Sequence, residues 1–345
     1  MTTFKTTRGC ILGISLALVL AACSSSASTP APAATGTTAP AATGTTAPAG
    51  TAPAACTKTI GATLLSLQYP FLVTLNDAMK AEAAKEGVCF DSLDPRQKVD
   101  TELSQVEDLI TKKVDLMIMV PVDVTQSGAA AKKINDAGIP LMFVNTKLDA
   151  SFASSGGKVV TYVGSDDVKA GEIQGQYVVD TLGSGGGKII YLVGQYGGAS
   201  TNLRKQGFTE ILSKHPEISI ATELEGHGSR AEGKTIMEDL LQKYSTGQVQ
   251  AVICQNDEMA LGALSAIEAA GRRSEFKAIM GLDGEAEALT SISSGGLTAT
   301  VFQDAVAQGT GAIQTAVKIL NGQTVDPLID IPFKLVTKDN VAQFK

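Results

Sequence analysis

Several polar and aromatic side chains stand where predicted strands end, and their types suit the recognition of hydroxyl groups. Asp, Asn, Gln and Arg side chains form planar, often bidentate hydrogen bonds that match vicinal hydroxyls. Aromatic faces can cover the C–H side of a sugar ring. The candidate binding residues are Gln68, Tyr69, Phe71, Asn145, Arg204, Asn256, Asp283 and Gln303. Each alone could be a cap or turn residue, but their shared position at strand ends favours a binding site.

The stretch Gln250–Leu264 shows how such a residue is positioned. The apolar run Ala251–Cys254 predicts a strand, and a helix-period pattern starts at Met259. Ligands of α/β sheets bind at the carboxyl ends of strands, so we expect Asn256 to point its amide into a crevice. We expect Asp257 to be the N-cap of the helix, where its carboxylate accepts hydrogen bonds from free backbone N–H groups.

No motif of a catalytic or cofactor site accompanies these residues. The glycine run at 183–188 lacks the spacing of a P-loop, and it precedes a strand where a phosphate loop must follow one. No strand leads into G-x-G-x-x-G, no G-x-S-x-G elbow occurs, and His215 and His227 lack partners at metal-ligand spacing. An enzyme would need a general acid or base among the strand-end residues. The sequence therefore favours a binding protein without a cofactor or metal.

A regular alternation of strands and helices must position the candidate residues. Such βα repetition demands a parallel, doubly wound sheet with helices on both faces. Strands are expected at 59–65, 88–92, 115–120, 141–144 and 159–163, then at 188–193, 218–224, 251–254, 277–281 and 298–302, with a final strand pair near 328–336. Because residues 57–345 exceed the usual size of a single core, we predict two α/β lobes. The crevice between them is the expected site.

The first 56 residues have the composition of a leader and a tether. Two basic residues and a short apolar segment are typical of a signal peptide over residues 1–22. The small residues before Cys23 resemble the lipobox of bacterial lipoproteins, which implies that Cys23 is acylated; ordinary signal cleavage nearby is the alternative. Residues 23–56 are rich in Ala, Thr and Pro and repeat ATGTTAPA, so we expect a disordered tether between the lipid and the folded part.

Charge and cysteine content narrow the class further. The formal net charge is −7, and loss of the two basic residues of the leader makes it −9, so the exported protein is a poor candidate for nucleic-acid binding. Cys56 and Cys89 lie at the starts of predicted strands, and their sulfur atoms would meet if these strands are neighbours. A disulfide and two unpaired thiols both fit the sequence. Cys254 lies within an apolar strand, which is typical of a small buried hydrophobe.

These features resemble the bacterial periplasmic sugar-binding proteins of the ribose/galactose type. The resemblance covers nearly all of residues 59–340, and its most specific segments are Gln255–Ala263 and Gly281–Gly284. Pro70-Phe71 before a helix and Arg204 shortly before a Gly-Phe pair add to it. The residues that match the sugar contacts of ribose-binding proteins are Phe71, Arg204, Asn256, Asp283 and Gln303. Gln68 and Tyr69, which directly precede the same helix, are added to this set.

Two departures from the resemblance bear on the ligand. Ribose binders have an Asp-Arg pair after the fourth strand, where this chain has Asn145-Thr146. They place an aromatic residue in the second lobe, where this chain reads His227-Gly228-Ser229. Without the charged pair and the stacking ring, ribose itself is disfavoured. We expect another monosaccharide or a polyol, such as a pentose or an aldohexose like glucose.

The resemblance implies the type 1 periplasmic binding protein fold, in which a three-strand hinge joins two lobes. It places the N-terminal lobe at 57–163 plus 304–326 and the C-terminal lobe at 164–303 plus 327–345. The implied function is that of an extracytoplasmic, lipid-anchored monomer whose closed lobes dock on the permease of an ABC importer. A sugar-sensing subunit for a chemoreceptor or histidine kinase is the alternative.

Overall fold

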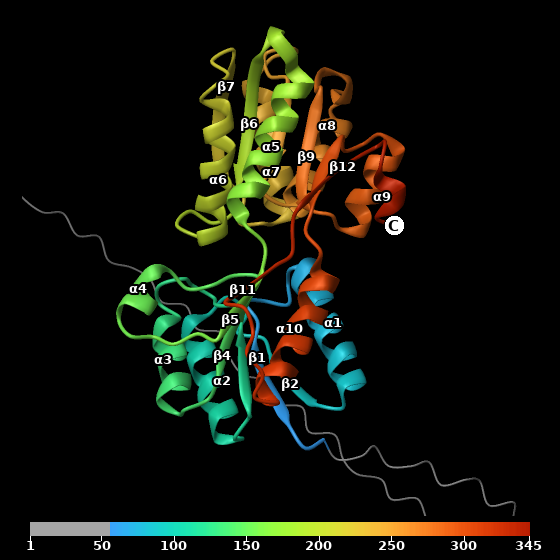
Figure 1. Ribbon diagram of the computed structural model, residues 1–345. Helices are drawn as coiled ribbons and strands as arrows, with labels where there is room; N and C mark the ends of the chain where they lie inside the picture. The colour runs from blue at the N-terminus through green and yellow to red at the C-terminus, as the bar shows by residue number, and fades with distance from the viewer. Residues whose placement is uncertain (1–55) are drawn as a thin grey trace, which may run out of the picture. The chain divides into compact units, whose positions relative to one another are not determined.

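Two six-stranded sheets form the centres of two α/β lobes in the computed structural model, which describes residues 56–345 (Figure 1). The first sheet has the order β11-β5-β4-β3-β1-β2, and all its strands run parallel. Its strands are β1 (Thr59–Thr63), β2 (Cys89–Leu93), β3 (Leu116–Met119), β4 (Leu141–Val144), β5 (Thr161–Gly164) and β11 (Leu328–Asp330).

Helices cover both faces of the first sheet. They are α1 (Pro70–Glu86), α2 (Val99–Thr111), α3 (Gly128–Asp136), α4 (Ala150–Ser154) and α10 (Ala305–Leu320). The apolar cluster on one face includes residues of α1 and α10, which lie side by side in Figure 1, and a second cluster joins α2, α3 and α4 to the other face. Pro70 starts α1 at a position that needs no backbone N–H, and Gly87 ends it with φ 70°.

The second sheet has the order β12-β10-β9-β8-β6-β7, with only β12 antiparallel. Its strands are β6 (Gly187–Val193), β7 (Ile218–Glu225), β8 (Ala251–Cys254), β9 (Ala278–Asp283), β10 (Ala299–Phe302) and β12 (Lys334–Thr337). Its helices are α5 (Asp167–Leu182), α6 (Ala199–Leu212), α7 (Arg230–Lys243), α8 (Asp257–Ala269) and α9 (Ala286–Ser294), with short 3₁₀ turns at Gly183–Gly185, Arg273–Glu275 and Val341–Gln343. Apolar clusters again occupy both faces, so the predicted class of two doubly wound lobes is confirmed.

Three short segments cross between the sheets. They are residues 165–166 after β5, 303–304 after β10 and 331–333 after β11. The last crossing corrects the predicted boundary at 326, because β11 pairs with β5 of the first sheet while β12 pairs with β10 of the second. The expected final strand pair is therefore divided between the lobes. The physical reason is apolar burial, since Ile329 and Ile331 pack against the core of the first lobe.

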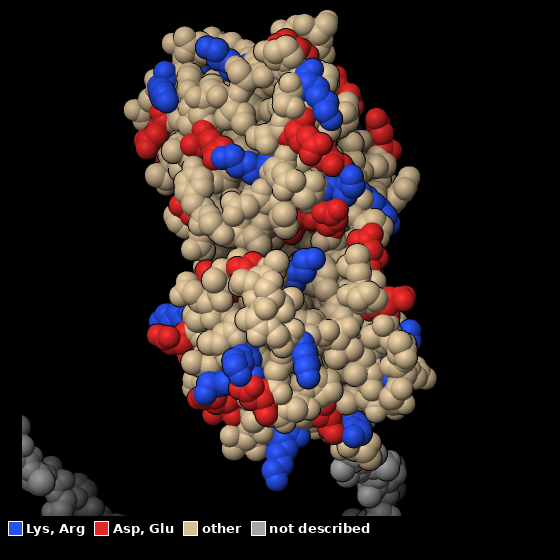
Figure 2. All heavy atoms as spheres, turned by 60° about the vertical axis from the view of Figure 1, so that its left-hand side comes forward, with Lys and Arg blue, Asp and Glu red and all other residues tan. Residues whose placement is uncertain are grey.

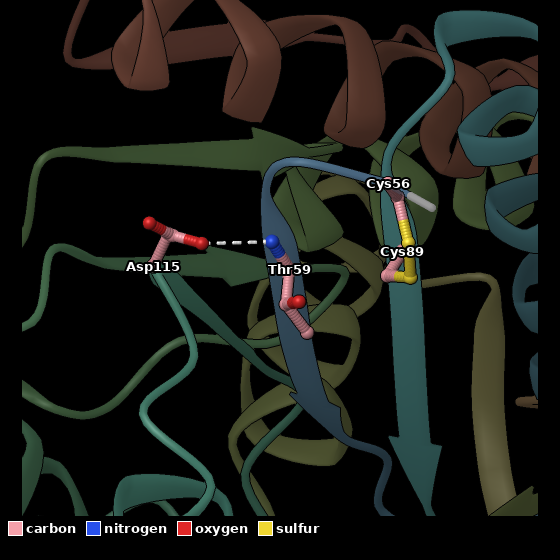
Figure 3. The surroundings of a disulfide bond; sticks show 4 residues. All are labelled: Cys56, Thr59, Cys89 and Asp115. Carbon is pink, nitrogen blue, oxygen red and sulfur yellow. Dashed lines mark hydrogen bonds between the residues drawn. A yellow bond between two sulfur atoms is a disulfide. The ribbon is translucent and has the colours of Figure 1, made fainter. Parts of the chain in front are cut away.

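A disulfide joins the start of β2 to the segment before β1. The structure bonds Cys56 to Cys89, whose Cα atoms are 5.5 Å apart (Figure 3). Beside it, the backbone N–H of Thr59 donates to Asp115 Oδ2 at 2.8 Å. These contacts attach the first strand of the domain at the sheet end opposite the carboxyl ends of the strands. Cys254 is a buried free thiol, as expected.

The surface charge, the helix lengths and the N-terminal segment are the features that concern where the protein is located. Acidic and basic side chains are interspersed over the face drawn in Figure 2, which has no broad basic area. Among residues 56–345, no helix has both the length and the apolar character needed to cross a membrane. The predicted signal peptide, the predicted lipidation at Cys23 and nearly all of the predicted tether lie outside the described residues.

Candidate functional site

The carboxyl ends of both sheets line one cavity of about 460 Å³. All the predicted site residues except Gln68 line it: Tyr69, Phe71, Asn145, Arg204, Asn256, Asp283 and Gln303. Gln68, in contrast to the prediction, does not line the cavity. It lies in the turn between Ser66 and Tyr69, where its backbone N–H donates to Ser66 Oγ at 3.3 Å and its side chain is exposed to solvent. The cavity therefore brings together every predicted residue but this one, although Arg204 lies within α6 rather than at a strand end.

Arg204 is held at the cavity wall by the close packing of α6 against α5. Gly171 on α5 makes this packing possible, because a Cβ there would clash with the carbonyl oxygen of Arg204. Arg204 Nε donates to Asp167 Oδ1 at 2.7 Å, and Nη1 donates to the carbonyl oxygen of Gln255 at 2.7 Å. Burial works to lower the pKa of Arg204, but the charges of Asp167 and Asp283 outweigh it and raise the pKa overall. Arg204 is therefore a fixed, charged donor.

Asp283 ends β9 in a backbone conformation that side chains rarely adopt, with φ 122°. Its carbonyl oxygen accepts a hydrogen bond from Gln303 N at 2.9 Å. Burial raises the pKa of its carboxyl well above the usual value, and Arg204 opposes this shift. Within the described part of the chain, the carboxylate of Asp283 accepts no hydrogen bond. Strained positions persist where the surroundings hold them, and they cluster at ligand sites.

Asn256 lines the cavity and also takes the capping role that was expected of Asp257. Asn256 is the N-cap of α8: its Oδ1 accepts from Met259 N at 3.0 Å, and its Nδ2 donates to the carbonyl oxygen of Gly228 at 3.0 Å. The prediction that Asp257 caps the helix is wrong. Its fully buried carboxylate accepts from Thr300 Oγ1 at 2.7 Å and from two backbone N–H groups after β9 at 2.8 Å each. Asp257 therefore fixes the loop that carries Asp283.

Tyr69 reaches from the first lobe to the loop that departs from ribose binders. Its hydroxyl donates to the carbonyl oxygen of His227 at 3.4 Å. A Cβ on Gly228 would lie 3.1 Å from Tyr69 Cε1 and 3.3 Å from Asn256 Nδ2. The ring of Tyr69 therefore lies beside Gly228, in the loop where the resemblance to ribose binders predicts an aromatic residue. Phe71 is mostly buried in the core of the first lobe and also lines the cavity.

Asn145 connects the cavity to the crossing segments. Its backbone is left-handed, with φ 63°, and its carbonyl oxygen accepts from Tyr162 Oη at 2.6 Å. Asn145 Nδ2 donates to Gln308 Oε1 at 3.3 Å, and Gln308 Nε2 donates to Ser165 Oγ at 3.0 Å. Ser165 Oγ in turn donates to the carbonyl oxygen of Ile331 at 2.5 Å. A cleft residue is thus hydrogen-bonded to two of the three crossings.

Gln303 lies on the remaining crossing with a side chain that is 3% exposed. Its Oε1 atom is buried and has no hydrogen-bond partner among residues 56–345. An unsatisfied buried polar group costs about 1–3 kcal/mol. Because Gln303 lines the cavity, a ligand that brings a hydrogen-bond donor relieves this cost.

Sequence reasoning missed several residues of the cavity. They come from the loops after β2, β3, β6 and β9 and from the first turn of α6: Gln97, Asp123, Gln126, Gly194–Thr201 and Glu285. All follow strands, so the strand-end rule applied to every loop would have found them. Gln255 also lines the cavity; it is 2% exposed, and its side chain donates to Tyr191 Oη at 2.7 Å and accepts from Gly194 N at 3.0 Å.

Metal chemistry has no support at this site. Within the described chain, no group of three or more His, Cys, Asp and Glu side chains is arranged to hold a metal ion. The arrangement instead offers charged and amide hydrogen-bonding groups together with aromatic rings, in a cavity between two lobes. This is a site for binding a small polar molecule.

Comparison with known proteins identifies the class. A family model for the periplasmic binding protein domain matches residues 60–324, and the chain belongs to this family. Two lobes of this kind are the type 1 periplasmic binding protein fold, as predicted. The family consists of ligand-binding proteins located outside the cytoplasm, and this chain is a binding protein rather than an enzyme.

Three particular proteins illustrate the similarity. The chain is 35% identical over 280 residues to the ribose import binding protein of Bacillus subtilis, with 81% of this chain and 87% of that protein covered. An ABC transporter solute binding protein from Bacillus halodurans, solved with bound myo-inositol, has a TM-score of 0.77 at 33% identity and covers 83% of this chain and 96% of its own. Another from Mycobacterium smegmatis, with bound glycerol, has a TM-score of 0.76 at 34% identity, with 83% and 96% covered.

Proposed function

We propose that this protein captures a polyhydroxylated ligand, a monosaccharide or a polyol, in the cavity between its lobes. The observation that carries the proposal is the convergence of Arg204, Asp283 and Gln303 on one cavity, with the acceptors of Asp283 and Gln303 unpaired. Arg204 donates to ligand oxygens, and Asp283 and Gln303 accept from hydroxyls. The rings of Tyr69 and Phe71 cover the apolar side of the ligand.

Ligand binding closes the lobes. Tyr69, Phe71 and Asn145 belong to the first lobe, whereas Arg204 and Asp283 belong to the second. A ligand that touches both sets binds the closed form more tightly than the open one, and this difference in affinity drives closure. The closed lobes are then the form that the membrane partner recognises.

The relatives support a ligand rich in hydroxyl groups. Their names and structures give ribose, myo-inositol and glycerol, which share vicinal hydroxyls and differ in size and ring. The Asn145-Thr146 pair and Gly228 depart from the ribose pattern, so the preferred ligand is a pentose, an aldohexose such as glucose, or a polyol other than ribose.

The membrane partner is the permease of an ABC importer, as the transport names of the relatives suggest. These names favour transport over the sensory alternative. Acylated Cys23 and the tether over residues 23–56 hold the monomeric domain at the outer side of the cell membrane.

A thermal-shift screen tests the ligand class. A ligand that binds only the folded state raises the free energy of unfolding by about 2.7 kcal/mol at 100 times its dissociation constant. We expect one or more sugars or polyols to raise the melting temperature by several degrees, and amino acids to have no effect. If no sugar or polyol stabilises the protein, the proposed function is wrong.

A further inference from the structure

The loop after β9 carries two carboxyl groups that no cation of the protein pairs with directly. Asp283 and Glu285 both line the cavity. No ion pair within residues 56–345 includes either side chain. Glu285 is partly buried, and its carboxyl interacts with that of Glu258 rather than with a basic group.

The nearby arginines are already engaged. Arg204 forms an ion pair with Asp167 at 2.7 Å, so it offsets the charge of Asp283 only in part. Arg230 contacts Glu258 at 2.5 Å and Glu287 at 2.8 Å. The second-lobe wall of the cavity therefore carries two carboxyl groups, Asp283 and Glu285, that form no ion pair with these arginines.

Gln303 supplies an independent observation beside these carboxyl groups. Its strand neighbour Phe302 pairs in register with Asp283, and Gln303 N donates to the Asp283 carbonyl. The buried Gln303 Oε1 is an acceptor without a donor. Asp283, Glu285 and Gln303 thus line the same cavity, and a ligand can supply donors to their oxygen atoms. A metal ion does not fit, because the described residues contain no suitable ligand cluster.

We propose that the preferred ligand is an amino-substituted polyol, an amino sugar or an amino cyclitol, whose ammonium group lies against Asp283 and Glu285. An ammonium brings a positive charge and three N–H donors, which matches two carboxyl groups without a basic partner and an unpaired amide oxygen. A sugar acid brings a negative charge to the same wall and is rejected. This inference rests on the proposed function and names the substrate class of that same site.

Proton release gives the site a signature that a neutral sugar lacks. Burial, followed by the charges of Asp283, Asp257 and Glu258, raises the pKa of Glu285 to about 9. Arg204 and Arg230 are the cations on the neighbouring helices, and both have carboxylate partners. Glu285 is therefore protonated near neutral pH in the free protein. A bound ammonium favours its ionised form, so an amine ligand displaces a proton from it.

Calorimetry with matched ligands tests the inference. Near pH 7, we titrate the full-length protein with glucose, glucosamine and glucuronate, and with myo-inositol and an amino-inositol. We expect at least one amine to bind about tenfold or more tightly than its neutral parent, because a hydrogen bond to a charged group is worth more than one between neutral groups. Titrations in two buffers of different ionisation enthalpy should show proton release for the amine only.

Variants assign the effect to Glu285. Glu285→Gln should remove most of the preference for the amine over its neutral parent, and it should abolish the proton release. Glu210→Gln removes an exposed charge from the same lobe and should leave the preference unchanged. Melting curves check that the variants fold. Glu285→Ala is measured as a second variant, so that the test still stands if Glu285→Gln fails to fold.

The outcomes separate the two proposals. Equal or tighter binding of the neutral parents overturns the amine preference and leaves the sugar-binding function in place. An amine preference that survives both Glu285 variants overturns the role of Glu285. Absence of binding by every compound in the panel, together with a negative thermal-shift screen, overturns the proposed function as well.

Discussion

At the scale of single residues, strain and unpaired polar groups mark the cavity. Asp283, Asn145 and His227 have positive φ values without being glycine, and all three line the cavity. Two of them are predicted site residues. Such conformations cost free energy and cluster at ligand sites in proteins. Their occurrence around the cavity therefore indicates that the backbone is arranged for a ligand.

Removal of the Asp283 carboxylate should weaken binding without unfolding the protein. For Asp283→Ala, we expect about 10- to 100-fold weaker binding of the best ligand from the screen, since a hydrogen bond to a charged group is lost. Calorimetry measures the affinity. Asp239→Ala, an exposed change on α7, is the control that should bind normally. Unchanged affinity of Asp283→Ala would remove Asp283 from the binding site.

Glu102 should make stability depend on pH. It is fully buried on α2, where it accepts hydrogen bonds from Val122 N at 3.1 Å and from Ser127 Oγ. Burial raises its pKa from 4.5 to about 7, and these hydrogen bonds only partly oppose the shift. The folded state binds the proton of the Glu102 carboxyl more tightly than the unfolded chain does. The stabilisation of the folded state by this proton is therefore fully present below the unfolded pKa and is lost as pH rises through the folded pKa.

The Glu102→Gln variant isolates this contribution. The stability that Glu102 contributes through its proton should fall by about 2–3 kcal/mol as pH rises from about 4.5 to above 7. Glu102→Gln cannot ionise, so its free energy of unfolding should fall less over this range. Urea unfolding at several pH values measures the difference, and Glu107→Gln, exposed on the same helix, should follow the wild type. Parallel curves for wild type and Glu102→Gln would contradict the shift.

At the scale of elements, buried hydrogen bonds connect α10 to the crossings. Gln308 is fully buried and bridges Asn145 to Ser165, which bonds to Ile331. If α10 served only to pack against the sheet, an apolar side chain would suit position 308 as well as glutamine does. The bridge therefore connects the cleft to the segments that cross between the lobes.

Gln308→Leu should affect both stability and binding. The change leaves the amide of Asn145 and the hydroxyl of Ser165 without this partner, at a cost of about 1–3 kcal/mol. We expect a lower free energy of unfolding in urea and about three- to tenfold weaker ligand binding. Gln314→Leu, an exposed change on the same helix, should leave affinity unaltered. If both variants bind alike, the bridge does not position the cleft.

The disulfide should stabilise the first sheet. Cys56 and Cys89 are 33 residues apart, and closing a loop of this length contributes about 3–4 kcal/mol in the chain-entropy account. The double variant Cys56→Ser/Cys89→Ser should lose this stability, and reduction of the wild type should lower stability equally. Thiol titration of the unfolded, unreduced wild type is the check: reactive thiols at both Cys56 and Cys89 would show that they are unpaired.

At the scale of the whole molecule, the proposed function requires both lobes and the proposed anchor at the membrane. The cavity needs both lobes, because its predicted residues are shared between them. The proposed anchor keeps the domain near the permease, and the predicted tether lets the domain extend from the membrane surface to reach it.

Cys23→Ala should release the protein from the membrane. Without the thiol there is no site for the lipid, and a signal core alone does not hold an exported protein. Fractionation of cells should find the variant in the soluble or secreted fraction, and labelling with a radioactive fatty acid should fail. Cys254→Ala, at the buried free thiol, should stay in the membrane fraction. Membrane retention of Cys23→Ala would exclude acylation at this residue.

The sequence alone determined the fold class and seven of the residues that line the cavity. Alternating strand and helix patterns predict parallel sheets, and the carboxyl ends of parallel strands meet at one edge, so Asn256, Asp283 and Gln303 could be assigned to one site. Tertiary structure decided what local patterns do not encode. The carboxylate of Asp257 does not cap α8 but accepts a hydrogen bond from the buried Thr300. The strand β11 belongs to the first lobe because Ile329 and Ile331 pack against the core of that lobe. These outcomes depend on contacts between segments distant in the chain, which is also why the raised pKa of Glu285 arises only in the folded molecule.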